Sequence, residues 1–270
     1  MPRRVSFDDD TALAPASEGV WEGAIAAGWD TPRGPLGGYV MAIMLRGFEL
    51  AVADPERQAR SVTMHFLRVP EAGPVRVSAR VERAGRSLST VSGRMEQEGK
   101  LLGLALGAYS KPWEGPLLDQ APMPEVEPPD SPAAPQASMR NTEPPPFLER
   151  MIMQHRFGDR PFTRSDKAEV GGWLGVRDDR PIDALAIAVL ADAWFPAPWP
   201  RLSELAPAPT IDLTIHFRSP LPAPGPVLLG RFDSRYVRDG FFDENGELWS
   251  PDGTLVAQSR QLGLLLGAKT

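Results

Sequence analysis

The sequence contains no cysteine and only three histidines in 270 residues. The lack of cysteine excludes disulfides, thiolate nucleophiles, cysteine-ligated zinc and iron–sulfur clusters. His65, His155 and His216 leave little material for a histidine-based metal site. We therefore expect neither a metal centre nor a bound cofactor.

Long apolar runs and an excess of positive charge are also missing. No stretch approaches the roughly 18 apolar residues of a membrane span, and the N-terminal MPRRVSFDDD has two arginines without an apolar run behind them. It is not typical of a secretory signal, so a cytoplasmic location is expected. The net charge of −6 argues against a general affinity for nucleic acid or anionic membranes.

Several catalytic motifs are absent as well. The chain has no G-x-S-x-G, G-x-x-x-x-G-K-[ST], G-x-G-x-x-G or H-E-x-x-H pattern. Serine-hydrolase, nucleotide-hydrolase, dinucleotide-binding and zinc-protease functions all lose support. A loose H-x-x-x-D pattern from His155 to Asp159 is too short to carry weight.

Proline is abundant and unevenly placed. Eleven prolines lie between Pro112 and Pro146, too many for a helix or a central strand. The stretch is typical of an extended linker. It predicts an N-terminal unit at 1–112, a proline-rich linker at 113–146 and a C-terminal unit at 147–270. An excursion within a single domain is the alternative.

The two units share four landmarks in the same order, which indicates a duplication. SVTMHF at 61–66 matches DLTIHF at 212–217, and each is followed by Gly-Pro-Val. A glycine turn follows in both, and then EGKLL at 98–102 matches DGTLV at 252–256. We expect each copy to be a meander of long antiparallel strands.

One strand is especially clear. The segment 210–218 alternates, which places Ile211, Leu213, Ile215 and Phe217 on one face, and Thr210, Asp212, Thr214 and His216 on the other.

An apolar segment of helical length precedes each meander. YVMAIMLRGFELAVAD follows Gly37-Gly38, and ALAIAVLADAWF follows Asp183, a candidate N-cap. Both segments are apolar nearly all round, so both helices should be buried. A long central helix wrapped by a curved antiparallel sheet, occurring twice, describes an α+β double hotdog.

Four positions could carry chemistry. Asp192 falls on the apolar stripe of the second helix, where desolvation would raise its pKa as suits a general base, although it could instead cap the helix end. Thr210 begins the alternating strand, and Gln261 lies within an apolar strand, where it needs partners only if it faces inward. Gly37-Gly38 would let a ligand approach backbone amides at a helix N-terminus.

These residues resemble the type II acyl-CoA thioesterase family along essentially the whole chain. The entry GPLGGYV at 34–40 is similar to the family's helix entry. The family places an Asp in the second helix, a Thr or Ser at the start of the next long strand and a Gln in the last strand. Here these are Asp192, Thr210 and Gln261. The prolines from Pro196 to Pro209 depart from the pattern and could reshape the mouth of a pocket.

The resemblance implies hydrolysis of an acyl-CoA thioester by one water held by Asp192, Thr210 and Gln261, with Asp192 as the general base. Backbone amides at the helix entry would receive the oxyanion. An apolar slot would take the acyl chain. The residues expected there are Gly37, Gly38 and Tyr39 for the oxyanion, and Met41, Met44 and Trp194 for the acyl chain. Asp212 is a rival carboxylate beside Thr210.

Two other functions stay open. One is a hotdog protein that binds acyl-CoA or an acyl chain without hydrolysis, as a sensor or carrier. The other is hydratase chemistry, but His65 and His216 lie opposite the apolar strand face with no matching helix acid, so solvated or interface roles are favoured. A homodimer or higher homo-oligomer is expected because a sheet edge would otherwise stay exposed.

Overall fold

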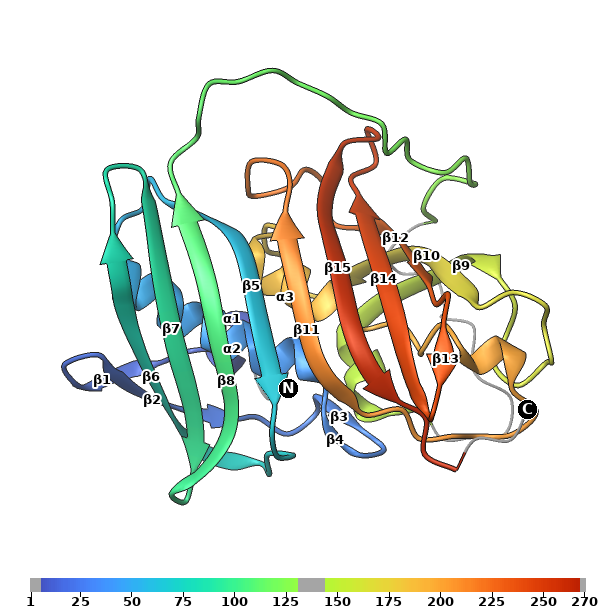
Figure 1. Cartoon of the computed structure of the whole chain (residues 1–270), viewed down its shortest axis with the longest axis horizontal. Helices are drawn as coiled ribbons and strands as arrows, with labels where there is room; N and C mark the ends of the chain where they lie inside the picture. Colours follow the sequence, from blue (N-terminus) through green and yellow to red (C-terminus); the bar gives the residue numbers. More distant parts are fainter. Residues whose placement is uncertain (1–5, 131–143, 268–270) are drawn as a thin grey trace.

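The computed structural model describes residues 6–130 and 144–267, and its framework is one large antiparallel sheet (Figure 1). The front half contains α1 (Phe7–Asp10), β1 (Ala14–Ser17), β2 (Val20–Ile25), β3 (Asp30–Thr31), β4 (Gly34–Pro35), α2 (Gly37–Val52), β5 (Gln58–Phe66), β6 (Gly73–Ala84), β7 (Leu88–Gln97) and β8 (Lys100–Ser110). The back half contains the 3₁₀ turns η1 (Pro146–Arg150) and η2 (Trp199–Arg201), the helix α3 (Ala184–Leu190), and the strands β9 (Met151–Gly158), β10 (Glu169–Val176), β11 (Thr210–Phe217), β12 (Leu228–Asp233), β13 (Val237–Arg238), β14 (Phe241–Trp249) and β15 (Leu255–Leu264).

The strand order repeats from the centre of the sheet outwards. It runs β1-β2-β6-β7-β8-β5 and then β11-β15-β14-β12-β10-β9, with β13 paired to β14. The seam is the antiparallel pair β5 and β11, in which Thr63 lies opposite Thr214 and their hydroxyls are 2.9 Å apart. Those two threonines occupy the same place in the repeated sequence. The strand order of the back half therefore mirrors that of the front half about this seam.

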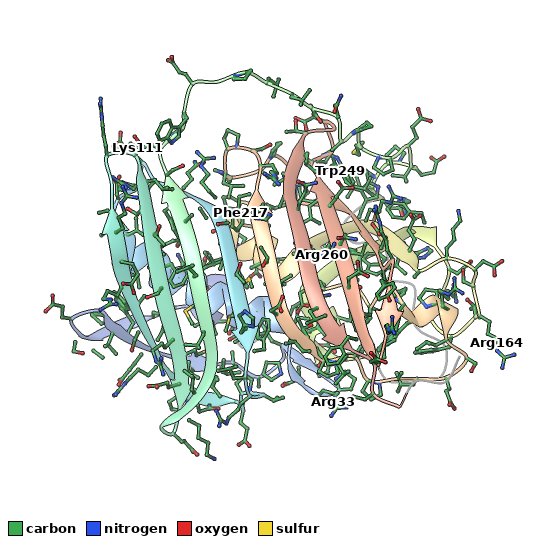
Figure 2. All side chains as sticks on the ribbon, viewed as in Figure 1. Arg33, Lys111, Arg164, Phe217, Trp249 and Arg260 are labelled. Carbon is green, nitrogen blue, oxygen red and sulfur yellow. The ribbon has the colours of Figure 1, made fainter. Side chains whose placement is uncertain are left out.

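Both helices lie on one side of the sheet (Figure 1). α2 packs against α3 and against β6 and β7, as its fully buried apolar residues require. The opposite face carries polar pairs such as Arg260 of β15, bonded to Asn245 and Asp243 of β14 (Figure 2). No described helix is long and apolar enough to cross a membrane.

The back helix is shorter than the sequence predicts. α2 has 16 residues, as expected, whereas α3 has seven and ends at Leu190. Asp183 does cap α3, since its side chain accepts from the amide of Ala186 at 2.9 Å. The prediction of a long helix reaching Phe195 is wrong: the backbone tightens after Leu190, where the amide of Asp192 donates to the carbonyl of Val189, three residues earlier, at 3.2 Å. Pro196 restricts only the far end of the predicted helix, since it disfavours a helical conformation at Phe195. Asp192 consequently lies in the turn after α3.

The segment between the halves packs on the back half before it leaves the described part of the chain. Residues 111–130 have no regular secondary structure and arch past one end of the strands, from β8 to the back half (Figure 1). Their carbonyls accept from two buried indoles: Trp249 Nε1 donates to Ala121 at 2.9 Å and Trp173 Nε1 to Glu127 at 2.9 Å. The predicted linker thus has fixed contacts at Ala121 and Glu127, while its residues 131–143 lie outside the described residues.

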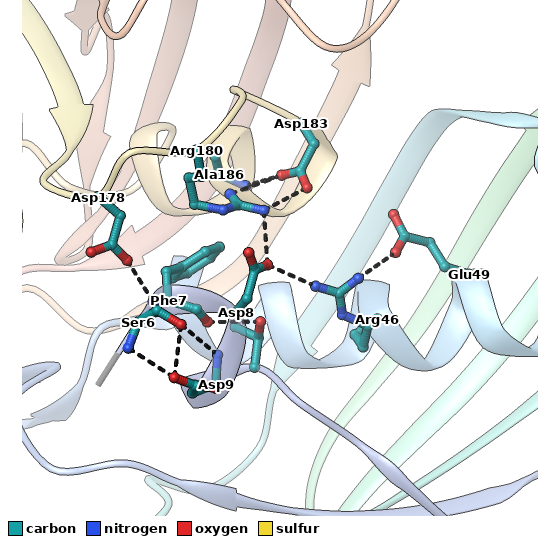
Figure 3. A network of polar contacts seen from close by, with 11 residues as sticks. Ser6, Phe7, Asp8, Asp9, Arg46, Glu49, Asp178, Arg180, Asp183 and Ala186 are labelled. Carbon is teal, nitrogen blue, oxygen red and sulfur yellow. Dashed lines mark hydrogen bonds and ion pairs between the residues drawn. The ribbon is translucent and has the colours of Figure 1, made fainter. Parts of the chain in front are cut away.

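An ion-pair network holds the N-terminal segment against both helices (Figure 3). Asp8 of α1 contacts Arg46 of α2 at 3.2 Å and Arg180, which precedes α3, at 3.1 Å. Arg180 also pairs with the capping Asp183 at 2.7 Å, and Arg46 pairs with Glu49 at 3.3 Å. The network fixes the start of α3 relative to α2, and so helps to set where the turn after α3 lies.

Candidate active site

Asp192 meets the beginning of α2. Its Oδ2 accepts a hydrogen bond of 2.7 Å from the amide of Gly38. Burial raises the pKa of Asp192 to about 6, while hydrogen bonds from the Gly38 and Gly37 amides act in the opposite direction. A carboxyl group with such a pKa is ionised at neutral pH and remains basic enough to take a proton from water.

The contact between Asp192 and α2 depends on glycine. A Cβ on Gly38 would lie 2.3 Å from the carbonyl oxygen of Ala188, and a Cβ on Gly37 would lie 3.1 Å from Asp192 Oδ2. Neither glycine needs a positive φ. Their role is to allow the close approach of α2 to α3 and to the carboxylate.

Thr210 and Gln261 lie together on the buried face. Thr210 Oγ1 donates to Gln261 Oε1 at 3.0 Å. Gln261 is 8% exposed and lies opposite Leu213, so it faces inward. The outward orientation that a mid-strand glutamine usually has does not apply here.

A β-bulge turns Thr210 toward Gln261. In the pairing of β11 with β15, Thr210 lies opposite Gly263 and Asp212 opposite Leu262, so two steps along β11 match one along β15. Thr210 therefore shares a face with Gln261, and Asp212 points to the other face. The expectation that Thr210 and Asp212 share one face is wrong because simple alternation does not survive the bulge.

Glu244 joins this cluster and was not among the predicted site residues. It lies opposite Gln261 in the pairing of β14 with β15 and is 5% exposed. Its Oε1 accepts from Gln261 Nε2 at 2.6 Å and its Oε2 from the amide of Ala197 at 2.6 Å. Burial first, and then the charge of Asp192, raise its pKa to about 8 against these two hydrogen bonds. A sequence signal does exist: the alternating buried residues of β14 are Phe242, Glu244, Gly246 and Leu248, and Glu244 is the charged residue among them.

The amides expected to receive an oxyanion already have acceptors. The amide of Gly38 donates to Asp192, and that of Tyr39 donates to the carbonyl of Leu36 at 3.1 Å. Gly37 also interacts with Asp192. The contacts show this helix N-terminus holding the Asp192 carboxylate, and they do not support an oxyanion role for Gly37, Gly38 or Tyr39.

The three residues expected to line an acyl slot divide into two groups. Met41 and Met44 are fully buried, and the sulfur of Met44 lies 2.6 Å from where a Cβ of Gly93 would be, so Met44 packs on β7 in the front half. Trp194 is two residues from Asp192, with its ring 6.3 Å from that of His155. Its buried Nε1 has no hydrogen-bond partner among the described residues. Of the three, only Trp194 belongs to the segment that carries Asp192.

The proline-rich stretch after Asp192 forms a cap on the ends of β14 and β15. Trp199 Nε1 donates to the carbonyl of Ala206 at 2.9 Å, which closes the segment on itself. Leu202 and Ala206 pack with Phe242 and Leu265. Within the described ranges, no group of three or more His, Asp or Glu side chains is arranged to hold a metal ion.

Comparison with known proteins identifies the class of enzyme. A family model for the acyl-CoA thioesterase N-terminal domain matches residues 25–110, and one for the C-terminal domain matches residues 123–265. The back-half model alone covers more than half of the chain. The chain is a thioester hydrolase, and it belongs to the type II acyl-CoA thioesterase family.

Solved structures agree with this assignment. A protein from Alicyclobacillus acidocaldarius described as having a hot dog fold is 27% identical over 98% of both chains, with a TM-score of 0.82. A candidate thioesterase II from Thermobifida fusca is 29% identical over 98% of this chain and 99% of that one, with a TM-score of 0.75. An acyl-CoA thioesterase II from Mycobacterium marinum, 22% identical over 96% of each chain with a TM-score of 0.75, shares the fold. No curated protein gives a match. The fold is of the hotdog type, with a large antiparallel sheet and few helices.

Proposed function

We propose that the chain hydrolyses acyl-CoA thioesters with a single water held by Asp192, Thr210 and Gln261. The observation that carries this proposal is a carboxylate held by the start of α2 whose charge acts on Glu244, the residue that binds Gln261 of the Thr–Gln pair. Asp192 takes one proton as the water oxygen attacks the thioester carbonyl carbon. The carbon–sulfur bond then breaks, and the CoA thiolate leaves and receives that proton.

The direction of the Thr210 hydrogen bond supports its role. Because the hydroxyl proton points to Gln261 Oε1, the lone pairs of Thr210 Oγ1 are left to accept a proton from the water. With Asp192 accepting the other proton, the water would present its own lone pair to the carbonyl carbon. Fixing the water in this way lowers the entropic cost of attack.

The experiment is thiol release from short, long and aromatic acyl-CoAs, with the wild type and Asp192→Asn. We expect the variant to lose about 10³-fold in kcat while acyl-CoA binding persists. A wild type that binds acyl-CoA tightly and hydrolyses no member of the panel would replace the enzyme with the non-catalytic binding protein.

We also propose that the front and back halves are two hotdog repeats, 1–112 and 147–270, joined by the linker 113–146. The mirrored strand order and the β5–β11 seam support this division. A protease site inserted after Gly115, whose Cβ direction is open, should yield two fragments that remain associated through the seam. Fragments that separate without denaturant would contradict it.

A homodimer or larger assembly of this chain is proposed on the sheet edges. β1 and β9 end the strand order, and every residue of β1 is exposed. An exposed edge strand favours pairing with another chain. Light scattering of the purified protein should give a mass of at least two chains, and a monomeric mass at all concentrations would contradict it.

A further inference from the structure

Glu244 touches two separate parts of the candidate active site. One carboxyl oxygen accepts from the side chain of Gln261, and the other accepts from the backbone of Ala197 in the segment that follows Asp192. The general base and the Thr–Gln pair come from different stretches of chain. Among the described contacts, Glu244 is the residue that ties the two together.

A carboxyl group suits this place because of its acceptors. It has lone pairs on both oxygens, whether or not it is ionised, whereas an amide has an acceptor on one atom only. Both groups that face Glu244 are N–H donors. Gln261 must therefore turn its Nε2 toward Glu244, and its Oε1 is then left facing Thr210.

We propose that Glu244 is a positioning residue for thioester hydrolysis: its carboxyl group holds the amide of Gln261 in the orientation that makes Thr210 donate to Gln261 and leaves Thr210 free to accept from the water. This rests on the proposed function of Asp192, Thr210 and Gln261. Glu244 itself does not touch the substrate. Its burial makes the hydrogen bonds strong and makes their loss costly.

Glu244→Gln breaks the arrangement with little change in shape. The new side chain has one acceptor for two donors. If it accepts from Ala197, its own amide protons face Gln261, which must then turn its oxygen toward position 244 and its Nε2 toward Thr210. The hydroxyl of Thr210 then becomes an acceptor from Gln261 and no longer donates to it.

The double variant Glu244→Gln with Gln261→Glu restores the hydrogen bonds to Ala197 and Thr210 and reverses only the one between positions 244 and 261. The amide at position 244 accepts from Ala197 and donates to the carboxyl group at position 261. The other oxygen of that carboxyl group accepts from Thr210. The carboxyl and amide groups have exchanged places, and the donor at Thr210 has not changed.

The expected kinetic result is a drop of about tenfold or more in kcat for Glu244→Gln, with KM within about threefold of wild type. The double variant should recover a large part of that loss. Rescue by exchange is a result that a merely structural role would not give. Glu244→Gln with the kcat of wild type, or a double variant no more active than Glu244→Gln alone, would overturn the proposal.

Glu247→Gln is the matched control. Glu247 lies on the same strand, accepts from Gln258 Nε2 at 3.1 Å and lies opposite that glutamine in β15, but on the other face of the sheet. It repeats the same chemistry away from the site. We expect its kcat to equal that of wild type, and an equal loss in both variants would overturn the proposal.

A second measurement does not depend on activity. In the NMR spectrum, the side-chain amide protons of Gln261 are identified by their loss in Gln261→Glu. In the wild type, one of them should exchange slowly with water. In Glu244→Gln it donates instead to the hydroxyl of Thr210, which is half-buried, so its protection should fall by about tenfold. Unchanged protection would overturn the proposal. If Asp192→Asn keeps full activity, the proposed mechanism fails, and this measurement still decides whether Glu244 holds the amide.

Discussion

Around Gln261, the two halves of the sheet have matching strand pairings but different side chains. In the back half, Gln261 lies between Leu213 of β11 and Glu244 of β14. In the front half, Gly107 lies between Val62 of β5 and Val91 of β7. The polar pair of one half is thus a glycine and a valine in the other.

The bulge is present in both halves. Ala59 of β5 lies opposite Tyr109, and the register shifts before Ser61, as it does after Thr210 in β11. A Cβ on Gly107 would lie 2.9 Å from the ring of Phe48, which fills the space of the missing glutamine. The bulge positions a side chain but does not itself make a site. The polar groups of the back half, a hydroxyl, an amide and two carboxyl groups, make the difference.

Replacing a site residue of the back half by its front-half counterpart should give the largest loss of kcat in this comparison. Thr210→Ala introduces the front-half residue and removes the group proposed to orient the water, so kcat should fall by about 100-fold. The mirror variant Ala59→Thr should keep its kcat, although a buried hydroxyl there should lower stability by about 1–3 kcal/mol. Steady-state kinetics of both proteins check this, and equal losses of kcat would remove the distinction between the halves.

Making the front half like the back should damage packing and add no chemistry. Gly107→Gln must displace Phe48 and bury an amide beside Val91, so we expect a loss of about 2 kcal/mol in the free energy of unfolding. Denaturant unfolding measures it. Gly115→Gln, at a glycine with open space around it, is the control, and a similar loss in both would contradict the packing account.

The pH dependence of the wild type should report the back-half carboxylate. The pKa of Asp192 is raised to about 6, mainly by burial, and a general base works only when ionised. kcat/KM should therefore be level well above this pKa and fall toward about tenfold per pH unit below it. A profile of kcat/KM that stays flat down to about pH 4 would show that no group with this pKa acts as the base.

The smallest change in kcat is expected for a residue on the face of the sheet that points away from Gln261. Asp212→Asn changes a carboxylate that the bulge directs away from Gln261, so kcat should stay within about threefold of wild type. The same assay used for Asp192→Asn decides it. A loss comparable with that of Asp192→Asn would mean that Asp212 shares the catalytic role.

The sequence was informative where the pattern is local and regular. The alternation of β11 from Leu213 onwards, the cap at Asp183 and the buried helix α2 were all predictable because each depends on a few neighbouring residues. The family resemblance then selected three residues from different segments, and the structure brings Thr210 and Gln261 into contact.

The predictions from sequence were wrong where the backbone departs from a regular strand or helix. An extra residue in β11 reverses the face of Thr210, and the backbone leaves the α-helical conformation after Leu190, before Asp192. Glu244 could not be assigned to the site in the same way, because it meets Gln261 only through the pairing of β14 with β15. The partner of a buried glutamine depends on strand pairing, which lies outside any local window of sequence.

The seam between β5 and β11 joins the two halves within one chain, and this affects how the sequences of the two halves can diverge. If the two halves were separate chains, a homodimer built on that seam would carry two identical copies of every position, and any substitution would appear twice. In a single chain each copy can change independently. Gly107 and Val91 can serve packing while Gln261 and Glu244 form a polar cluster, and one chain carries one such cluster among its described residues.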